Sequence, residues 1–229
     1  METVTHPERM TLLSRQFHAR GERIGFVPTM GSLHEGHLSL IRRSKTAAAR
    51  TVVSAFVNPV QFGPAEDFQK YPRNPERDAE LARLAGADIL YVPQVADVYP
   101  APYKTYVAVE GLGTILEGAS RPGHFRGVAT VVTKLFNRVA PDMAFFGQKD
   151  VQQAILIQKL VRDLEMDILI EVCPTVREED GLAMSSRNVF LTPVQRRAAP
   201  VLYRALRKAE LAIRERERSA ARIVKLIRE

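Results

Sequence analysis

The chain has 229 residues, 45% of them apolar, which is enough to bury a full α/β core, and no apolar run approaches the roughly 20 residues that a membrane helix needs. Cys173 is the only cysteine, which excludes an internal disulfide, and METVTHPERM lacks the apolar stretch of a signal peptide, so we expect a cytoplasmic protein with no membrane partner. The net charge of +7 arises after residue 192, where the sequence has eleven Lys and Arg residues and four Glu residues. The first 192 residues contain equal numbers of basic and acidic residues, which argues against a nucleic-acid partner.

Predicted strands and helices alternate along the chain. This is the pattern of a parallel sheet covered by helices on both faces. The sequence therefore predicts a Rossmann-like, doubly wound α/β fold. The expected strands are residues 23–27, 51–57, 88–92, 143–146 and 167–172, and the expected helices are residues 33–45, 76–87, 127–139 and 151–164.

A change of pattern near residues 187–193 indicates a domain boundary. Thr192 and Pro193 form a favourable N-cap and first helical position. The remaining sequence is helical and Arg-rich, and Pro200 is the one place where we expect a break. We therefore predict a Rossmann-like domain over residues 1–187 and a mainly helical C-terminal portion over residues 188–229.

The segment PTMGSLHEGH, residues 28–37, follows the first predicted strand. Ser32 and Glu35 have the spacing of a capping box, so we expect a helix whose free N–H groups face a phosphate. His34 and His37 lie three residues apart and share a helix face. Gly36 makes a helix about 1 kcal/mol less stable than Ala would. A glycine at this position therefore indicates that a ligand approaches the backbone closely. One alternative to phosphate binding is that both histidines lie on the surface of an ordinary helix. A zinc site is another alternative, but it would need a third protein ligand.

Polar residues also follow three other predicted strands. Asn58 and Gln61 carry amides suited to a small hydroxy acid. Lys149, near the start of the next helix, is suited to a phosphate, and Arg187 lies on a loop that follows the last strand. Because ligands bind outside the carboxyl ends of parallel strands, we expect these loops to form one crevice.

These segments resemble a known family. PTMGSLHEGHLSL, FVNPVQF, RPGHF, FGQKDVQQ and DGLAMSSRN are similar to the corresponding segments of the pantothenate synthetase family, which belongs to the HxGH nucleotidyl-transferring α/β superfamily. The resemblance covers about residues 20–200. It implies ATP-dependent condensation of pantoate with β-alanine through a pantoyl-adenylate, with release of pyrophosphate and AMP. It also implies ATP as co-substrate, Mg²⁺, and a homodimer. By the same resemblance, residues 1–187 form the ATP- and pantoate-binding domain and residues 188–229 form part of a C-terminal lid domain.

The resemblance also implies roles for individual residues. His37 is the expected proton donor, with His34, Lys149 and Arg187 as further catalytic residues. Asp78 is a candidate Mg²⁺ ligand, although a surface carboxylate at a helix start is the commoner case. The implied ATP-binding residues are Met30, Gly31, Ser32, Leu33, His34, Glu35, Gly36, His37, Gly147, Gln148, Lys149, Asp150, Val176, Met184, Ser185, Ser186 and Arg187. The implied pantoate and β-alanine contacts are Gln61, Gln153, Asn58 and Arg121.

The sequence departs from the family at its C-terminal end. Members normally continue for several dozen residues, whereas this chain ends inside a predicted helix, so a catalytically impaired short form is one alternative. A second alternative is another HxGH nucleotidyltransferase, and an assay for dependence on β-alanine would distinguish it from a pantothenate synthetase. A nucleic-acid-binding module, suggested by the basic terminal segment, and a non-catalytic scaffold are the remaining alternatives.

Overall fold

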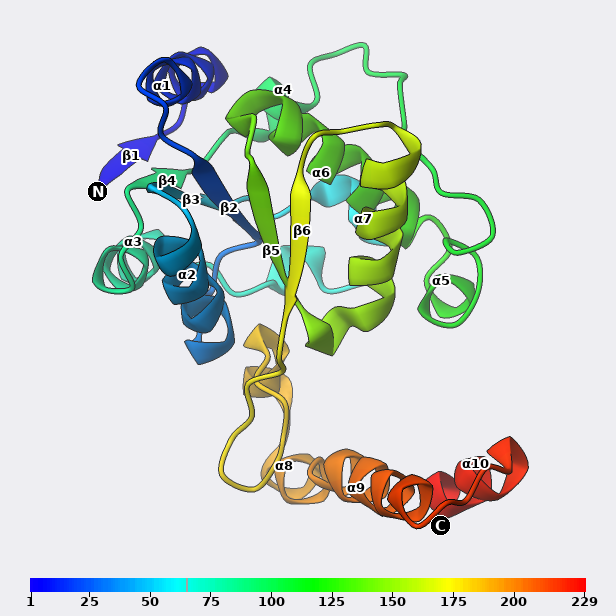
Figure 1. Cartoon of the computed structure of the whole chain (residues 1–229). Coiled ribbons are helices and arrows are strands. Elements are labelled where there is room, and N and C mark those ends of the chain that lie inside the picture. The colour runs from blue at the N-terminus through cyan, green and yellow to red at the C-terminus, as the bar shows by residue number, and fades with distance from the viewer. Residues whose placement is uncertain (65) are drawn as a thin grey trace. The chain divides into compact units, whose positions relative to one another are not determined.

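The computed structural model describes residues 1–64 and 66–229, which form two compact units, Met1–Pro174 and Thr175–Glu229 (Figure 1). Within the described residues, the N-terminal unit contains a six-stranded parallel sheet with the order β1-β4-β3-β2-β5-β6. The doubly wound α/β fold is therefore confirmed. The strands are β1 (Glu2–Val4), β2 (Ile24–Thr29), β3 (Arg50–Ala55), β4 (Ile89–Tyr91), β5 (Met143–Gly147) and β6 (Leu169–Cys173).

Helices and short 3₁₀ turns connect these strands. The predicted helices at 33–45, 76–87, 127–139 and 151–164 are all present, with shifted ends, as α2, α3, α6 and α7. The helices of the N-terminal unit are α1 (Pro7–Ala19), α2 (Glu35–Ala47), α3 (Pro75–Leu84), α4 (Val95–Val98), α5 (Glu117–Ser120), α6 (His124–Val139) and α7 (Val151–Asp163), and its 3₁₀ turns are η1 (Pro59–Gln61), η2 (Phe68–Lys70) and η3 (Gln148–Asp150).

Both faces of the sheet are buried. On β2, Phe26 belongs to one core cluster and the next residue, Val27, belongs to the other, because successive side chains of a strand point to opposite faces. The first cluster takes in the apolar sides of α1, α6 and α7, and the second takes in those of α2 and α3. A strand buried on both faces reads as a continuous apolar run, which is why β2 and β3 could be predicted.

The strand order places a switch point beside β2. The chain passes from β2 to β3 and β4 in one direction and then adds β5 and β6 on the other side of β2. Connections that leave neighbouring strands in opposite directions open a crevice at the carboxyl end of the sheet. The loops after β2, β3 and β5 are the ones that border this position.

A row of tyrosines lies between α4 and α6 in the sequence. The ring centroids of Tyr99 and Tyr103 are 4.9 Å apart, and those of Tyr103 and Tyr106 are 5.3 Å apart. From α6, Lys134 Nζ lies 4.8 Å from the centroid of Tyr103 and 5.8 Å from that of Tyr99. We call Tyr99, Tyr103 and Tyr106 the tyrosine row.

The C-terminal unit contains η4 (Ser186–Phe190), α8 (Pro193–Ala198), α9 (Val201–Arg214) and α10 (Ala220–Arg228). Thr192 Oγ1 accepts a hydrogen bond from Gln195 N, which confirms the predicted helix start. The helix breaks before Val201, as expected near Pro200. A second break between α9 and α10 was not predicted. The unit begins at Thr175, whereas the domain boundary after residue 187 stays a prediction. No helix in the described part of the chain is both long enough and apolar enough to span a bilayer.

Candidate functional site

The turn between β2 and α2 has an unusual backbone. Gly31 and Ser32 have φ angles of +78° and +51°, and helix α2 starts at Glu35 with His34 as its N-cap. The predicted capping box between Ser32 and Glu35 is therefore wrong. Ser32 lies in the left-handed region two residues before the N-cap, so it does not occupy the extended conformation that an N-cap requires.

The two histidines form the cap themselves. His34 Nδ1 accepts a hydrogen bond from Gly36 N at 3.1 Å, and His37 Nδ1 accepts one from His34 N at 3.4 Å. Their ring centroids are 4.1 Å apart. A ring nitrogen that accepts a hydrogen bond carries no proton, so the proton of each neutral ring is on Nε2. Each imidazole therefore has an Nε2–H group that can donate to a phosphate oxygen.

Both rings are neutral near pH 7 in the free protein. Burial, together with the nearby His34 and Lys149, lowers the pKa of His37 to about 3. Burial and Lys149 also lower the pKa of His34. In this state the pair donates hydrogen bonds but holds no imidazolium proton. The prediction that His37 supplies a proton stays a prediction for the nucleotide-bound protein.

Asp78 supports the same turn from a neighbouring helix. It lies in the first turn of α3, its side chain is buried, and its carboxylate accepts hydrogen bonds from Ser32 N at 2.8 Å and Leu33 N at 2.7 Å. Within the described residues, no group of three His, Cys, Asp or Glu side chains could hold a metal ion. These contacts indicate that Asp78 supports the turn. They favour this role over the two considered from the sequence, a surface carboxylate and a metal ligand.

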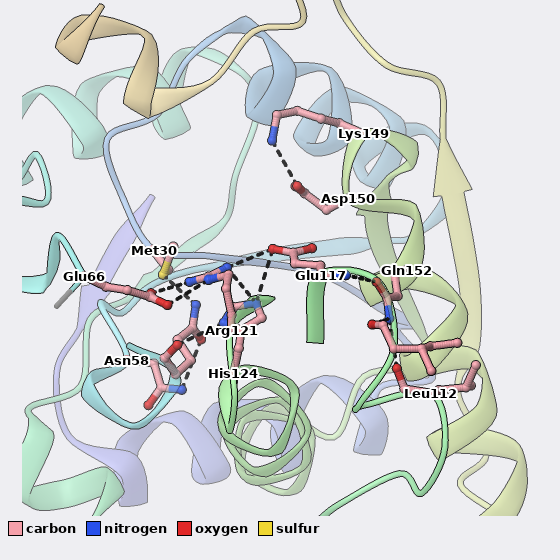
Figure 2. A network of polar contacts seen from close by, with 12 residues as sticks. Met30, Asn58, Glu66, Leu112, Glu117, Arg121, His124, Lys149, Asp150 and Gln152 are labelled. Atoms are coloured by element: carbon pink, nitrogen blue, oxygen red, sulfur yellow. Dashed lines mark hydrogen bonds and ion pairs between the residues drawn. The ribbon is translucent and has the colours of Figure 1, made fainter. Parts of the chain in front are cut away.

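The amides that follow β3 lie close to this turn (Figure 2). Asn58 Nδ2 donates to Gln61 Oε1 and to Gly127 O, each at 3.1 Å. Asn58 Oδ1 accepts from Tyr99 Oη at 2.7 Å and from Val60 N at 3.3 Å. Since the Asn58 amide makes all of these contacts within the protein, it positions Gln61 and the η1 turn.

Gln61 is the amide that faces the turn after β2. It is buried, and its Nε2 group lies 3.0 Å from Met30 Sδ. A thioether is a weak acceptor, so a better acceptor on a ligand can replace it at little cost. The structure thus brings together Met30, Asn58 and Gln61, three of the predicted site residues.

Arg121 is held in an ionic cluster (Figure 2). Its guanidinium donates to Glu66 at 2.9 and 2.6 Å and to Glu117 at 2.8 Å, and Nη1 lies 3.1 Å from His124 Nε2. The hydrogen bond from Arg121 holds the pKa of Glu66 below its usual value. His124 Nδ1 lies 2.9 Å from Gln61 O, so the cluster also contacts the η1 turn.

Sequence reasoning singled out Arg121 and His124 but not the two glutamates that pair with Arg121. Glu66 and Glu117 lie far apart in the sequence and show no common motif. His124 stands in the RPGHF block, which was the one available signal. Burial is the main cause that lowers the pKa of His124, so this imidazole is mainly neutral at pH 7. In the structure Arg121 already pairs with two carboxylates, and a substrate carboxylate would have to compete with them.

The segment after β5 places a cation near the histidines. Lys149 Nζ pairs with Asp150 Oδ1 at 2.9 Å, and the effect of Lys149 on the pKa values of both histidines indicates its proximity. Asp150 occupies the N-cap position of α7 but makes no side-chain capping bond. Gln153 follows one turn later. The neighbouring Gln152 instead fastens the chain before α5, because its Nε2 group donates to Leu112 O at 2.9 Å and to Ile115 O at 2.8 Å.

The remaining predicted ATP residues belong to the C-terminal unit. Met184 N donates to Val176 O at 3.0 Å, which joins the two arms of the loop. Ser185 Oγ accepts from Arg187 N at 3.3 Å and caps η4. Ser186 is buried, and it begins η4. Val176, Met184 and the SSR segment therefore form one local structure inside this unit.

Comparison with known proteins gives a consistent result. The family described as Pantoate-beta-alanine ligase matches residues 2–229. The pantothenate synthetase of Pelotomaculum thermopropionicum is 59% identical over 213 residues, which are 93% of this chain and 76% of that protein. That of Heliobacterium modesticaldum is 54% identical over 229 residues, which are 100% of this chain and 82% of that protein.

Solved structures agree with these relatives. The pantothenate synthetase of Thermus thermophilus has a TM-score of 0.93 at 48% identity, with 100% of this chain and 81% of that one covered. The pantoate-beta-alanine ligase of Francisella tularensis, complexed with beta-gamma ATP and beta-alanine, has a TM-score of 0.85 at 39% identity, with 90% and 79% covered.

Proposed function

Because the chain belongs to the pantoate–β-alanine ligase family, we propose that it makes pantothenate through a pantoyl-adenylate intermediate. The chain is a ligase that condenses pantoate with β-alanine at the expense of ATP. The observation that carries the mechanism is the pair of Nε2–H donors of His34 and His37 beside Lys149, at the carboxyl edge of the sheet. This is an arrangement for binding phosphate oxygens.

In the first step, a carboxylate oxygen of pantoate attacks the α-phosphorus of ATP. The bond from that phosphorus to the bridging oxygen breaks, and pyrophosphate leaves with the electron pair. No protein nucleophile is required, so the enzyme contributes orientation and stabilisation of charge. His34, His37 and Lys149 would donate to the oxygens on which negative charge increases. A proton for the pyrophosphate would come from His37 once phosphate charge has raised its pKa.

In the second step, the neutral amine of β-alanine attacks the acyl carbon. The carbon–oxygen bond to the phosphate breaks, AMP leaves, and the nitrogen loses a proton. Gln61 is suited to contact pantoate and β-alanine because its amide lies beside Met30 and is fixed by Asn58. Gln153 would bind pantoate, and Arg121 would contact a substrate carboxylate by exchanging an ion-pair partner.

The loop of the C-terminal unit carries the other proposed nucleotide contacts. The resemblance assigns Val176, Met184, Ser185, Ser186 and Arg187 to this role. A guanidinium and two hydroxyl groups suit the charged oxygens of a triphosphate. In the N-terminal unit, the proposed ATP contacts are Met30–Leu33 and Gly147–Asp150.

Mg²⁺ is the expected companion of ATP. The described residues offer no group of three metal-ligating side chains, and the carboxylate of Asp78 accepts two backbone N–H groups. The described part of the chain therefore does not provide a set of protein ligands for the ion. We propose that Mg²⁺ enters with the nucleotide, held by phosphate oxygens and water. Neither step above needs a protein ligand for it.

We further propose that the enzyme is a cytoplasmic homodimer. The resemblance supports the dimer, and the single, buried Cys173 fits a reducing compartment. Light scattering of the purified chain would give the mass of the assembly. A monomeric mass at working concentration would contradict the dimer and leave the chemistry untouched.

Pyrophosphate exchange into ATP tests the reaction. We expect exchange only with pantoate present, and we expect AMP and pantothenate to appear after β-alanine is added. Exchange without pantoate would contradict the adenylate, and product formation with other amines but not β-alanine would indicate another nucleotidyltransferase. ATP binding without exchange would indicate a catalytically impaired form.

A further inference from the structure

The turn that presents the two histidines needs support from outside itself. Gly31 and Ser32 are consecutive residues with φ of +78° and +51°. Glycine tolerates this region, but for serine it is strained. Thr29 Oγ1 accepts from Gly31 N at 3.1 Å, which fixes only the first half of the turn. The second half leads directly into the N-cap residue His34.

Asp78 provides the support for this second half. Its two oxygens accept separately from Ser32 N and Leu33 N, at 2.8 and 2.7 Å, and only 4% of the residue is exposed. A Cβ added at Gly31 would lie 2.9 Å from Asp78 Oδ2, so the carboxylate is packed tightly against the turn. The helix that carries Asp78 is fixed in turn by the Asn74 cap.

Resting on the proposed adenylation, we propose that Asp78 is a positioning residue that sets the placement of His34 and His37 for attack on the α-phosphate. By holding Ser32 N and Leu33 N, it fixes where α2 begins and thereby the direction of both Nε2–H groups. This role differs from metal binding, in which the carboxylate would face the phosphates. Here it faces the backbone.

The main test is Asp78→Asn. An asparagine presents one acceptor and one NH₂ group, so one of the two backbone N–H groups loses its partner and meets a donor. Displacing a catalytic group by about 1 Å relative to the reacting atoms is sufficient to reduce turnover by about 10²-fold. We expect kcat for pantoate-dependent pyrophosphate exchange to fall by about this factor, with KM for ATP and pantoate changed much less. Glu76→Gln, at an exposed acid of the same helical turn, is the matched control and should keep the original rate.

A second substitution tests the reason for the loss. Ser32→Gly removes the side chain that makes the left-handed turn unfavourable. In the Asp78→Asn background, Ser32→Gly should therefore recover part of the lost kcat. A residue that acted through a metal ion would not be rescued by a change of backbone freedom two residues before His34. Failure of Ser32→Gly to recover any activity would overturn the positioning role.

Two further measurements separate the possible results. Amide hydrogen exchange by NMR should show loss of protection at Ser32 and Leu33 in folded Asp78→Asn, a result that does not depend on catalysis. The Mg²⁺ concentration for half-maximal exchange should stay the same. A tenfold higher Mg²⁺ requirement with full recovery at excess Mg²⁺ would overturn the proposal in favour of a metal ligand. An unchanged kcat despite lost protection would overturn it as well. If the original chain shows no exchange, the proposed function fails while the amide measurement still tests the contact.

Discussion

Two histidines show how backbone contacts determine side-chain chemistry. Because both Nδ1 atoms accept from backbone N–H groups, the rings of His34 and His37 are fixed in one tautomer before a ligand arrives. Preorganised donors of this kind need no reorganisation when charge develops, which is the main way in which an enzyme stabilises a phosphoryl transition state. Burial keeps the rings neutral and thereby avoids repulsion between them and Lys149.

The lowered pKa of His37 predicts a dependence of stability on pH. The unfolded ring binds a proton below its ordinary value of 6.5, whereas the folded ring does so only near a pKa of about 3. The unfolded state therefore binds more protons between these values, and the free energy of unfolding falls as pH decreases below 6.5. His34 and His124 act in the same direction because their pKa values are also lowered.

The variant H37N should reduce this loss of stability. Between pH 6.5 and about 4.5 most carboxylates of the unfolded chain remain ionised. The change in the free energy of unfolding over this pH range therefore comes chiefly from histidines. We expect the urea midpoint of H37N to fall less than that of the original chain over this window, with H6N, at an exposed histidine, for comparison. An equal fall in H37N and the original chain would contradict the low pKa.

At the scale of elements, the close contact between α6 and η1 positions the amides of Asn58 and Gln61. Gly127 lies inside α6, and a Cβ added there would lie 2.6 Å from Gln61 Cα and 2.6 Å from Val60 O. The helix can approach this turn only because residue 127 has no side chain. The same approach brings Gly127 O to Asn58 and His124 to Gln61 O.

Gly127→Ala should therefore disrupt the amide turn. In an ordinary helix this change is stabilising by about 1 kcal/mol, because Ala is the better helix former. Here the contact is with backbone, so we expect a net loss of about 1–3 kcal/mol in the free energy of unfolding, as for other overpacked sites. KM for pantoate should rise as Gln61 moves. Urea unfolding and initial rates measure the two effects.

The control for Gly127→Ala is Gly63→Ala. The three atoms nearest to a Cβ at Gly63 would be Glu66 side-chain atoms at 3.6–3.8 Å, which is ordinary van der Waals contact. This variant should keep the stability of the original chain. Equal stability of both variants would show that α6 moves away without consequence and would contradict the argument from close approach.

Sequence reasoning predicted the central strands and the helices that follow them, but it missed helix α1, although five of its residues are buried, and strand β1. Strands β2 and β5 have long apolar runs, but β1 has three residues, Glu2–Val4, of which only Val4 is buried. The predicted start of α2 was wrong because the Ser32 backbone is in the left-handed region, which no residue pattern reveals. The ion pair of Arg121 with Glu66 was missed because these residues meet only through the tertiary fold, and Glu117, four residues before Arg121, lies outside the RPGHF block.

At the scale of the whole molecule, each unit has its own internal contacts. In the C-terminal unit, Gly181 has φ of +91°, and a Cβ there would lie 2.0 Å from Tyr203 Cδ1. Arg177 also contacts this ring, with its guanidinium carbon 4.2 Å from the Tyr203 ring centroid. These contacts join the loop that carries Ser185–Arg187 to helix α9.

Gly181→Ala should loosen the C-terminal unit selectively. The added methyl group combines a clash with an unfavourable φ, so we expect faster hydrogen exchange over residues 175–229 and unchanged exchange over 1–174. Gly21→Ala is the control, because Gly21 has φ of +71° and no neighbour within 4 Å of an added Cβ. Faster exchange throughout both units in Gly181→Ala would show that they unfold as one.

The tyrosine row has an optical consequence. The chain contains six tyrosines and no tryptophan, so its intrinsic fluorescence comes from phenol rings without energy transfer to indole. Tyr99, at one end of the row, donates its hydroxyl hydrogen to Asn58, whose amide in turn holds Gln61. An event that moves Gln61 therefore changes the hydrogen bond of an emitting phenol, and the protein contains an unlabelled reporter of the position of this amide.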